Sequence, residues 1–172
     1  YLDVAGGTGD IAFRILERLT GARTANPRDV SITVLDASES MIEKGRDRAI
    51  DAGILHSINW VRGNAERLPV EDASIDYCTI AFGIRNVERI DHALEECRRV
   101  LKPGGRFLCL EFSHLLLPFL SKIYDTYSFK VLPAMGELIT GNREAYQYLA
   151  ESIRRFPDQN KFAAMIDAAG LK

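Results

Sequence analysis

The chain has 172 residues, of which 47% are hydrophobic and 27% are charged, and its net charge is −2. This length suffices for one domain with a substantial core, and the composition excludes a disordered chain. The near-neutral charge excludes the basic surface typical of nucleic-acid binding, so no nucleic-acid partner is expected, and no apolar run reaches the ~18–20 residues of a membrane span. The three cysteines and three histidines lack metal-ligand spacing, so we expect no metal site and reduced, buried thiols in an intracellular compartment.

A short apolar strand at the start of the chain leads into a glycine-rich turn and then into an amphipathic helix. The turn carries Gly6, Gly7 and Gly9, and the helix is predicted over about 10–19. Glycines allow a sharp turn and the close approach of a ligand, and the helix directs its free N–H groups at that ligand. The alternative, an ordinary turn that needs flexible residues, is disfavoured by three glycines in four positions.

The letters of this turn leave two cofactor classes open. The segment Gly7-Thr-Gly-Asp-Ile-Ala12 satisfies the dinucleotide fingerprint, which allows alanine at its third position. The overlapping segment Asp3-Val-Ala-Gly-Gly-Thr-Gly9 resembles the adenosylmethionine-binding turn of class I methyltransferases, with Ala5 in place of the first glycine. Asp10 puts a negative charge at the helix N-terminus, which favours a ligand that bears an ammonium group over one that bears phosphates.

The next two predicted strands also end in polar residues. The strand 31–36 ends on Asp36, whose carboxylate can accept hydrogen bonds from both ribose hydroxyls of an adenosine; the alternative is a cap for the following helix. Asn64 and Ala65 follow the strand 57–61, at the edge where open α/β sheets bind ligands. Asn64 can accept a hydrogen bond from an adenine amino group, and the alternative is a simple Asx turn.

The fourth strand is predicted over 75–81 and is followed by Arg85 and Asn86, at the same edge of the sheet as the glycine turn. A helix over 91–101 comes next, and Lys-Pro-Gly-Gly separates it from a fifth strand over 106–112. This alternation of strands and helices predicts an α/β fold with a mainly parallel, doubly wound sheet and helices on both faces.

Eight sequence blocks together are similar to one family. In chain order they are Asp3-Val-Ala-Gly-Gly-Thr-Gly-Asp10, Gly63-Asn-Ala-Glu66, Phe82-Gly-Ile-Arg-Asn-Val87, Leu101-Lys-Pro-Gly-Gly-Arg106, Leu110-Glu-Phe-Ser113, Tyr127-Ser-Phe-Lys-Val-Leu-Pro133, Tyr146-Gln-Tyr-Leu-Ala-Glu-Ser-Ile153 and Phe156-Pro-Asp-Gln159. They closely resemble the ubiquinone/menaquinone biosynthesis C-methyltransferases, over essentially the whole chain. The resemblance implies a Rossmann-like class I methyltransferase fold, present as a single domain 1–172 that lacks the last two strands and the N-terminal helical segment of the family.

The resemblance also implies a cofactor and a reaction. The cofactor would be S-adenosyl-L-methionine, bound at the positions Gly6, Thr8, Asp36, Asn64 and Ala65. The substrate would be a polyprenyl benzoquinol, methylated on a ring carbon in ubiquinone (coenzyme Q) biosynthesis. The alternatives are a bacterial demethylmenaquinol methyltransferase and a non-catalytic scaffold of a quinone-biosynthesis complex.

Methylation of a quinol carbon needs a group that stabilises the phenolate and a base that removes the ring proton. Arg85 and Asn86 are our candidates: Arg85 would orient a water or stabilise the phenolate, and Asn86 would fix the quinol oxygen. A guanidinium with a pKa above ~12 is a poor direct base. The structural alternatives are an arginine that pins a loop and an asparagine that caps a helix.

Residues 114–155 are expected to form a helical insertion on the substrate side, which lines a tunnel for the polyprenyl tail or touches the bilayer surface. Its alternatives are a cover for the sheet and a homodimer contact. The resemblance leans toward the mitochondrial branch, which implies a peripheral membrane protein on the matrix side of the inner membrane, together with other coenzyme Q biosynthesis proteins. The alternative location is the bacterial cytoplasm.

A nicotinamide-dependent oxidoreductase is the competing enzyme class. It accounts for the glycine turn and for Asp36, but it does not account for Asn64 and Ala65 or for Leu-Lys-Pro-Gly-Gly. The sequence also lacks a Tyr-x-x-x-Lys pair that could assist hydride transfer.

Overall fold

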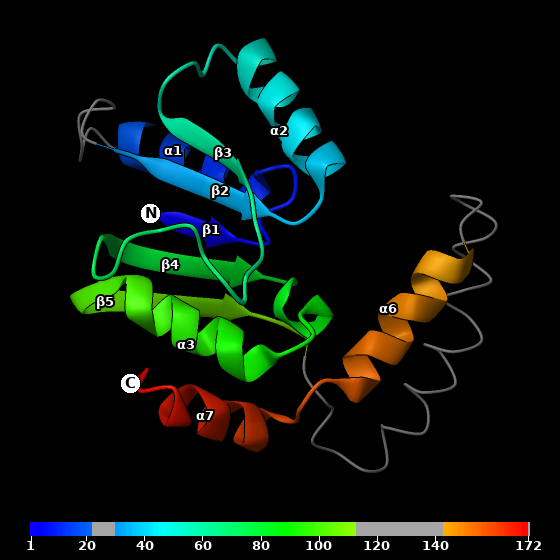
Figure 1. The fold of residues 1–172 in the computed structure, drawn as a ribbon. Coiled ribbons are helices and arrows are strands. Elements are labelled where there is room, and N and C mark those ends of the chain that lie inside the picture. The colour runs from blue at the N-terminus through cyan, green and yellow to red at the C-terminus, as the bar shows by residue number, and fades with distance from the viewer. Residues whose placement is uncertain (22–29, 113–142, 172) are drawn as a thin grey trace. The chain divides into compact units, whose positions relative to one another are not determined.

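The computed structural model describes residues 1–21, 30–112 and 143–171 (Figure 1). The chain divides into two compact units, of which the first comprises 1–111 with 165–172 and the second comprises 112–164. The predicted insertion over 114–155 lies outside the described residues except for its last part, from residue 143 onward.

A five-stranded parallel sheet forms the centre of the first unit. Its strands are β1 (Leu2–Val4), β2 (Ile32–Asp36), β3 (Ile58–Arg62), β4 (Ile75–Ala81) and β5 (Leu101–Leu110). Their order across the sheet is β3-β2-β1-β4-β5, so the chain runs outward from β1 first in one direction and then in the other (Figure 1). The parallel pairing confirms the predicted sheet. The order reverses beside β1, and all strands direct their carboxyl ends toward one edge of the sheet.

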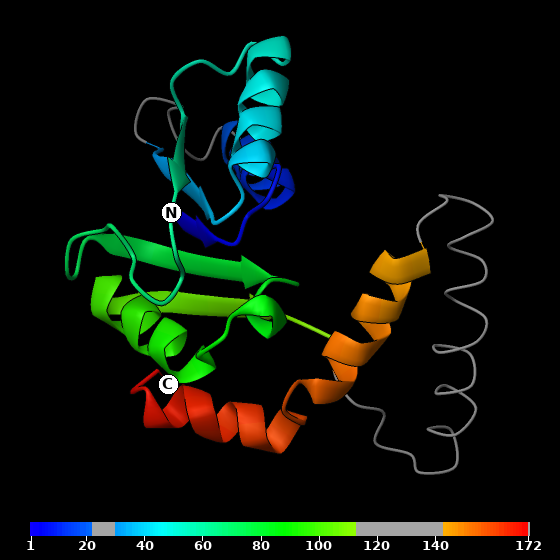
Figure 2. The same cartoon turned by 45° about the vertical axis from the view of Figure 1, so that its right-hand side comes forward.

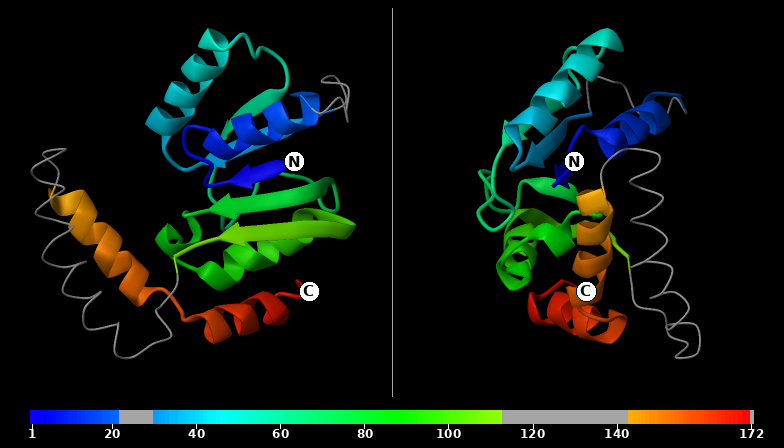
Figure 3. Two further views of the ribbon diagram at one scale, coloured as in Figure 1. Left: turned by 180° about the vertical axis from the view of Figure 1, so that it is seen from behind. Right: turned by 90° about the vertical axis from the view of Figure 1, so that its right-hand side faces the viewer.

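Helices cover both faces of this sheet, as predicted. They are α1 (Asp10–Gly21), α2 (Glu39–Asp51), the short helix η2 (Ile84–Asn86) and α3 (Ile90–Val100). The views from the front and from behind place α1 and α3 on opposite faces (Figures 1 and 3). Ala12 and Leu16 of α1 are buried against Ile32 and Val34 of β2, because apolar residues recur on one side of the helix.

The segment after α3 differs from the prediction. The helix ends at Val100, and β5 begins at once with Leu101, which pairs with Ile75. Pairing is then interrupted and resumes between Tyr77 and Arg106. Lys-Pro-Gly-Gly is therefore an irregularity inside β5 rather than a linker between a helix and a strand, because several residues of β5 lie opposite one residue of β4.

Trp60 of β3 packs between the glycine turn and α2. A Cβ atom on Gly9 would lie 2.5 Å from the Trp60 ring, and a Cβ on Gly45 would also overlap this ring. Gly9 in addition has a φ of +82°, a conformation that L side chains rarely adopt. Gly45 lies in the interior of α2, where glycine weakens a helix, so its presence there is explained by the space that the indole needs.

The Gly45→Ala variant tests this packing. Alanine is the better helix former by about 1 kcal/mol. We nevertheless expect the substitution to lower the free energy of unfolding by about 1–3 kcal/mol, because the methyl group overlaps the Trp60 ring. Urea denaturation measures the change. In the Trp60→Phe background the same substitution should cost less, and an equal cost in both backgrounds would contradict the explanation.

The described part of the second unit contains α6 (Arg143–Arg155), and α7 (Gln159–Ala168) begins there (Figure 2). The rings of Phe156 and Phe162 pack at a centroid distance of 4.9 Å and join the end of α6 to the start of α7. Among the helices of residues 1–21, 30–112 and 143–171, none has the length and apolar character needed to cross a membrane.

Candidate functional site

A cleft of about 690 Å³ lies at the carboxyl edge of the sheet, where the segments after β1, β2, β3 and β4 meet. The residues that line it are Ala5, Leu35, Asp36, Ala37, Arg62, Gly63, Asn64, Ala65, Glu66, Phe82, Gly83, Asn86, Val87 and Glu88. The structure thus brings Asp36, Asn64, Ala65 and Asn86 together around one cleft. Gly6, Thr8 and Arg85 are not among the described residues that line it. An open α/β sheet binds ligands at this position, beside the reversal of strand order.

The glycine turn is tight and leaves little room for side chains. A Cβ on Gly6 would lie 2.7 Å from Oδ2 of Asp3. Ala5, where the methyltransferase pattern has a glycine, keeps a left-handed φ of +53°, and its methyl group would lie 2.5 Å from a Cβ on Gly83. Gly83 therefore has to be glycine because Ala5 is not, and the ends of β1 and β4 approach each other closely beside the cleft.

Asp36 joins the glycine turn to the start of α2. Its Oδ2 accepts a hydrogen bond from the Gly7 N–H at 2.9 Å, and its Oδ1 accepts one from the Ser38 N–H at 2.9 Å. Asp36 is not the N-cap of α2: that position is Ser38, which makes no side-chain cap bond, and the Asp36 carboxylate closes a turn just before the helix. A carboxylate offers about four lone-pair positions, so Asp36 keeps acceptor capacity toward the cleft. Its contact with ribose hydroxyls stays a prediction.

Asn64 forms the Asx turn that was the structural alternative. Its Oδ1 accepts a hydrogen bond from the Glu66 N–H at 2.9 Å. This bond fixes the side chain at the rim of the cleft beside Ala65, which is buried. The predicted contact with an adenine stays a prediction, and it would have to use the second lone pair of Oδ1 or the side-chain NH₂ group.

Asp3 is a buried acid beneath the glycine turn that the sequence analysis did not single out as a site residue. Its side chain is 1% exposed, and burial raises the pKa of its carboxyl to about 6, although Oδ1 accepts a hydrogen bond from Thr79 at 2.7 Å. The charge of Asp36 raises this pKa further. Within the described residues, Oδ2 of Asp3 has no hydrogen-bond partner. A buried acid with a raised pKa beside a cleft is typical of a functional site.

Arg85 forms a buried ion pair with Glu111 at the end of β5. Its Nη1 lies 2.6 Å from Glu111 Oε1 and donates a second hydrogen bond to the Phe82 carbonyl at 2.6 Å. The two charged side chains are only 10% and 4% exposed. Phe82 has a left-handed φ of +56°, so Arg85 holds a strained backbone in place. The structural role that was the alternative for Arg85 is therefore present, and its catalytic role stays a prediction.

Thr8 and Asp10 contact Arg48 of α2. Arg48 donates hydrogen bonds to the Thr8 hydroxyl at 2.8 Å and to Asp10 Oδ1 at 2.9 Å, which lowers the pKa of Asp10. The negative charge of Asp10 is thus balanced by a side chain of the protein itself, which weakens the earlier argument that this charge selects an ammonium-bearing ligand.

The cysteines agree in part with the prediction. All three are free thiols; Cys78 and Cys97 are buried, whereas Cys109 is only partly buried. Among the described residues, no group of three or more His, Cys, Asp or Glu side chains is arranged to hold a metal ion.

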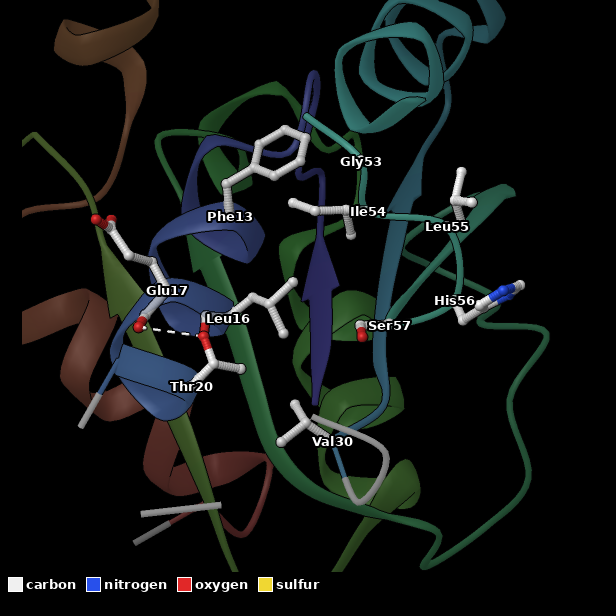
Figure 4. A pocket seen from close by; sticks show the side chains of 10 residues that line it. All are labelled: Phe13, Leu16, Glu17, Thr20, Val30, Gly53, Ile54, Leu55, His56 and Ser57. Atoms are coloured by element: carbon white, nitrogen blue, oxygen red, sulfur yellow. Dashed lines mark hydrogen bonds between the residues drawn. The ribbon is translucent and has the colours of Figure 1, made fainter. Parts of the chain in front are cut away.

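A second cleft, of about 660 Å³, lies between the last turns of α1 and the segment that leads into β3 (Figure 4). Figure 4 shows apolar side chains around it together with four polar ones, from Glu17, Thr20, His56 and Ser57. The Thr20 hydroxyl donates its hydrogen bonds to backbone carbonyls of α1. This cleft lies toward the amino ends of β2 and β3 and contains none of the predicted site residues. The cleft at the carboxyl edge is therefore the better candidate for catalysis.

The sheet order and the glycine turn beside its reversal define the Rossmann-like fold of the class I methyltransferases. Solved structures share this fold. A SAM dependent methyltransferase from Aquifex aeolicus superimposes with a TM-score of 0.65 at 15% identity, over 99% of this chain and 71% of that chain. The YcgJ protein from Bacillus subtilis superimposes with a TM-score of 0.66 at 23% identity, over 98% of this chain and 59% of that chain.

Residues 1–172 match the ubiE/COQ5 methyltransferase family, and the chain belongs to this family. It is 57% identical over 171 residues to the ubiquinone/menaquinone biosynthesis C-methyltransferase UbiE of Brucella abortus (strain S19), a match that covers 99% of this chain. The UbiE protein of Brucella suis biovar 1 (strain 1330) is 56% identical over the same share of the chain. The chain spans 61% of the length of these relatives.

Proposed function

We propose that this protein is an S-adenosylmethionine-dependent C-methyltransferase that methylates a ring carbon of a polyprenyl quinol in quinone biosynthesis. The observation that carries the proposal is the cleft at the carboxyl edge, where Asp36, Asn64, Ala65 and Asn86 meet beside the glycine turn in a chain of the ubiE/COQ5 family. The name of the Brucella abortus relative supports both the reaction class and the pathway.

The residues of the cleft fit S-adenosylmethionine. A Cβ on Gly6 would meet the buried Asp3 carboxylate, so a glycine at this position lets the turn pack closely over that acid. Asp36 offers lone pairs for ribose hydroxyls. The Asp3 carboxylate, with an oxygen that no described residue satisfies, favours a cationic ligand. When bound, the cofactor supplies a methyl group that a sulfonium makes electrophilic.

The protein would then have to orient the quinol, stabilise its phenolate and allow the ring proton to be removed. Asn86 lines the cleft, and its amide can hold a quinol oxygen. Arg85 precedes it in η2 and is fixed by Glu111 and by the Phe82 carbonyl. Because Glu111 neutralises the charge of Arg85, the pair suits the role of orienting Asn86 or a water better than that of a free cation beside a phenolate.

The name of the relatives covers both the ubiquinone and the menaquinone branch. Within our proposal the substrate is a polyprenyl benzoquinol, with demethylmenaquinol as the alternative. The relatives at 56–57% identity come from Brucella, so they support the bacterial setting and give no support to the mitochondrial one. A peripheral membrane contact, a complex with other quinone-biosynthesis proteins and a homodimer stay proposals that rest on the family resemblance.

Ligand-dependent thermal unfolding tests the cofactor class. We expect adenosylhomocysteine at about 100 times its dissociation constant to stabilise the protein by about 2.7 kcal/mol. For a chain of this length, this corresponds to roughly 5–11 °C in Tm. NADH at the same concentration is the control and should give no shift. A shift with NADH alone would favour the oxidoreductase, and the absence of any shift with adenosylhomocysteine would refute the proposed cofactor.

A further inference from the structure

Arg48 of α2 reaches across to the glycine turn, 40 residues earlier in the chain. Its Nη1 donates hydrogen bonds to the Thr8 carbonyl at 3.1 Å and to the Thr8 hydroxyl at 2.8 Å, and its Nη2 lies 2.9 Å from Asp10 Oδ1. The Thr8 hydroxyl in turn donates to Asp10 Oδ2 at 3.1 Å. The guanidinium carbon also lies 5.1 Å from the centroid of the Phe13 ring. One side chain thus joins the turn, the start of α1 and α2.

These contacts contribute little to global stability. The Arg48 and Asp10 side chains are 47% and 68% exposed, and ion pairs between exposed side chains add little to folding. The contacts are nevertheless concentrated on three residues of the turn and of the first turn of α1. An arginine is suited to this position because its planar group can donate to several acceptors at once, whereas a lysine presents one compact charge.

The turn is held from other sides as well. Asp36 accepts the Gly7 N–H from the end of β2, and Trp60 packs against Gly9. Neither of these contacts involves the Thr8 carbonyl, whereas Arg48 donates a hydrogen bond to it. Arg48 itself is not among the described residues that line the cleft. Its effect on a ligand would therefore pass through the backbone of the turn, which it holds in one conformation before the ligand arrives.

We propose that Arg48 is a positioning residue for the cofactor, which acts by clamping the glycine turn and not by touching the ligand. This inference rests on the proposed function, since the turn is assigned there to S-adenosylmethionine. It predicts a specific kinetic pattern. Loss of the Arg48 contacts weakens the binding of the cofactor. It leaves the binding of the quinol and the chemical step unchanged, because these do not depend on the glycine turn.

The test compares Arg48→Ala, Arg48→Lys and the control Arg46→Ala in the otherwise unchanged protein. Arg46 is an exposed arginine of the same helix, for which the described residues show no contact with the turn. We expect Arg48→Ala to weaken the binding of adenosylhomocysteine about tenfold in calorimetric titration, as loss of preorganisation would. The Tm without ligand should stay within about 3 °C of the parent value.

Steady-state kinetics provides the second readout. Arg48→Ala should raise KM for S-adenosylmethionine by about the same factor, with an unchanged KM for the quinol and an unchanged kcat at saturation. Arg48→Lys should recover part of the affinity, because it can pair with Asp10 but cannot make the fork of contacts to Thr8. If Arg48→Ala bound adenosylhomocysteine as tightly as Arg46→Ala does, the inference would be overturned. A fall in the Tm of Arg48→Ala large enough to explain its loss of affinity would overturn it as well. If the parent protein binds no adenosylhomocysteine, the proposed function is refuted, and this inference is refuted as well because it depends on that function.

Discussion

Replacement of Glu111 by alanine is expected to lower the free energy of unfolding by about 3–5 kcal/mol, because it leaves the charge of Arg85 buried without its carboxylate. The two side chains are 10% and 4% exposed, so water cannot replace the lost partner fully. The pair also holds Phe82 in its left-handed conformation through the second bond of Arg85 Nη1. The loss should therefore extend to the segment that carries Asn86.

A double-mutant cycle separates the pair from its surroundings. Glu111→Gln keeps an oxygen acceptor for Arg85 and should cost less than Glu111→Ala. The double replacement Arg85→Met with Glu111→Leu removes both charges and should restore much of the stability, since an apolar pair of similar size is often neutral or better. Urea denaturation of the parent, Arg85→Met, Glu111→Leu and the double variant gives the coupling free energy. Additive losses would show that the two charges do not depend on each other.

The second large effect concerns Asp3 and pH. Its pKa is about 6 in the folded protein against an ordinary value of 3.8, so the folded state holds this proton more tightly than the unfolded state does. The contribution of Asp3 to the free energy of unfolding therefore falls as the pH rises from about 4 to about 6, and stays at the lower level above that. The difference in pKa corresponds to about 3 kcal/mol, at about 1.4 kcal/mol for each pH unit.

Asp3→Asn should remove this dependence. The variant keeps an oxygen for the bond from Thr79 and cannot ionise. We expect it to be about 1–3 kcal/mol more stable than the parent at pH 7.5, and to lose that advantage at pH 4, where Asp3 is protonated. Urea midpoints across this range measure the difference between the two proteins, in which the other carboxyl groups cancel. A difference that does not change with pH would show that Asp3 is not the responsible group.

The same variant should bind the proposed cofactor less tightly. A buried carboxylate beneath the turn favours a cationic ligand, and asparagine offers no charge. Greater stability together with weaker binding is the expected trade-off where a strained or unfavourable group is kept for function. Titration with S-adenosylmethionine at pH 7.5 compares the two proteins directly.

The sequence predicted the fold well because its local signals agree with one another. Short apolar runs that mostly alternate with amphipathic stretches are typical of a parallel sheet covered by helices, and the structure has this order, with β3 and β4 joined by a loop instead of a helix. The predicted start of the fifth strand, at residue 106 instead of 101, was wrong because Lys-Pro-Gly-Gly is a strong signal for a break between a helix and a strand. That signal says nothing about whether the chain is already paired with β4 before it, as Leu101 is.

The convergence of several candidate residues on one cleft could be predicted from the sequence for a geometric reason, while their roles stay predictions. Asp36 ends a strand, and Asn64 and Asn86 each come after one. Because the carboxyl ends of parallel strands meet at one edge, residue position alone places these residues together. Arg48 and Glu111 escaped notice because their roles depend on packing between elements far apart in the sequence. Asp3 stands inside a strand, and its burial follows from the strands on both sides of it and not from its own neighbours in the chain.

Trp60 is the only tryptophan of the 172 residues, and its ring lies against Gly9 of the turn and Gly45 of α2. The emission of an indole depends on the polarity and the rigidity of its surroundings. The chain therefore carries a built-in fluorophore beside the turn that we propose to bind the cofactor. Its signal comes from a single location, so a change on titration needs no label and no assignment. The turn can then be followed in real time, during binding and during release.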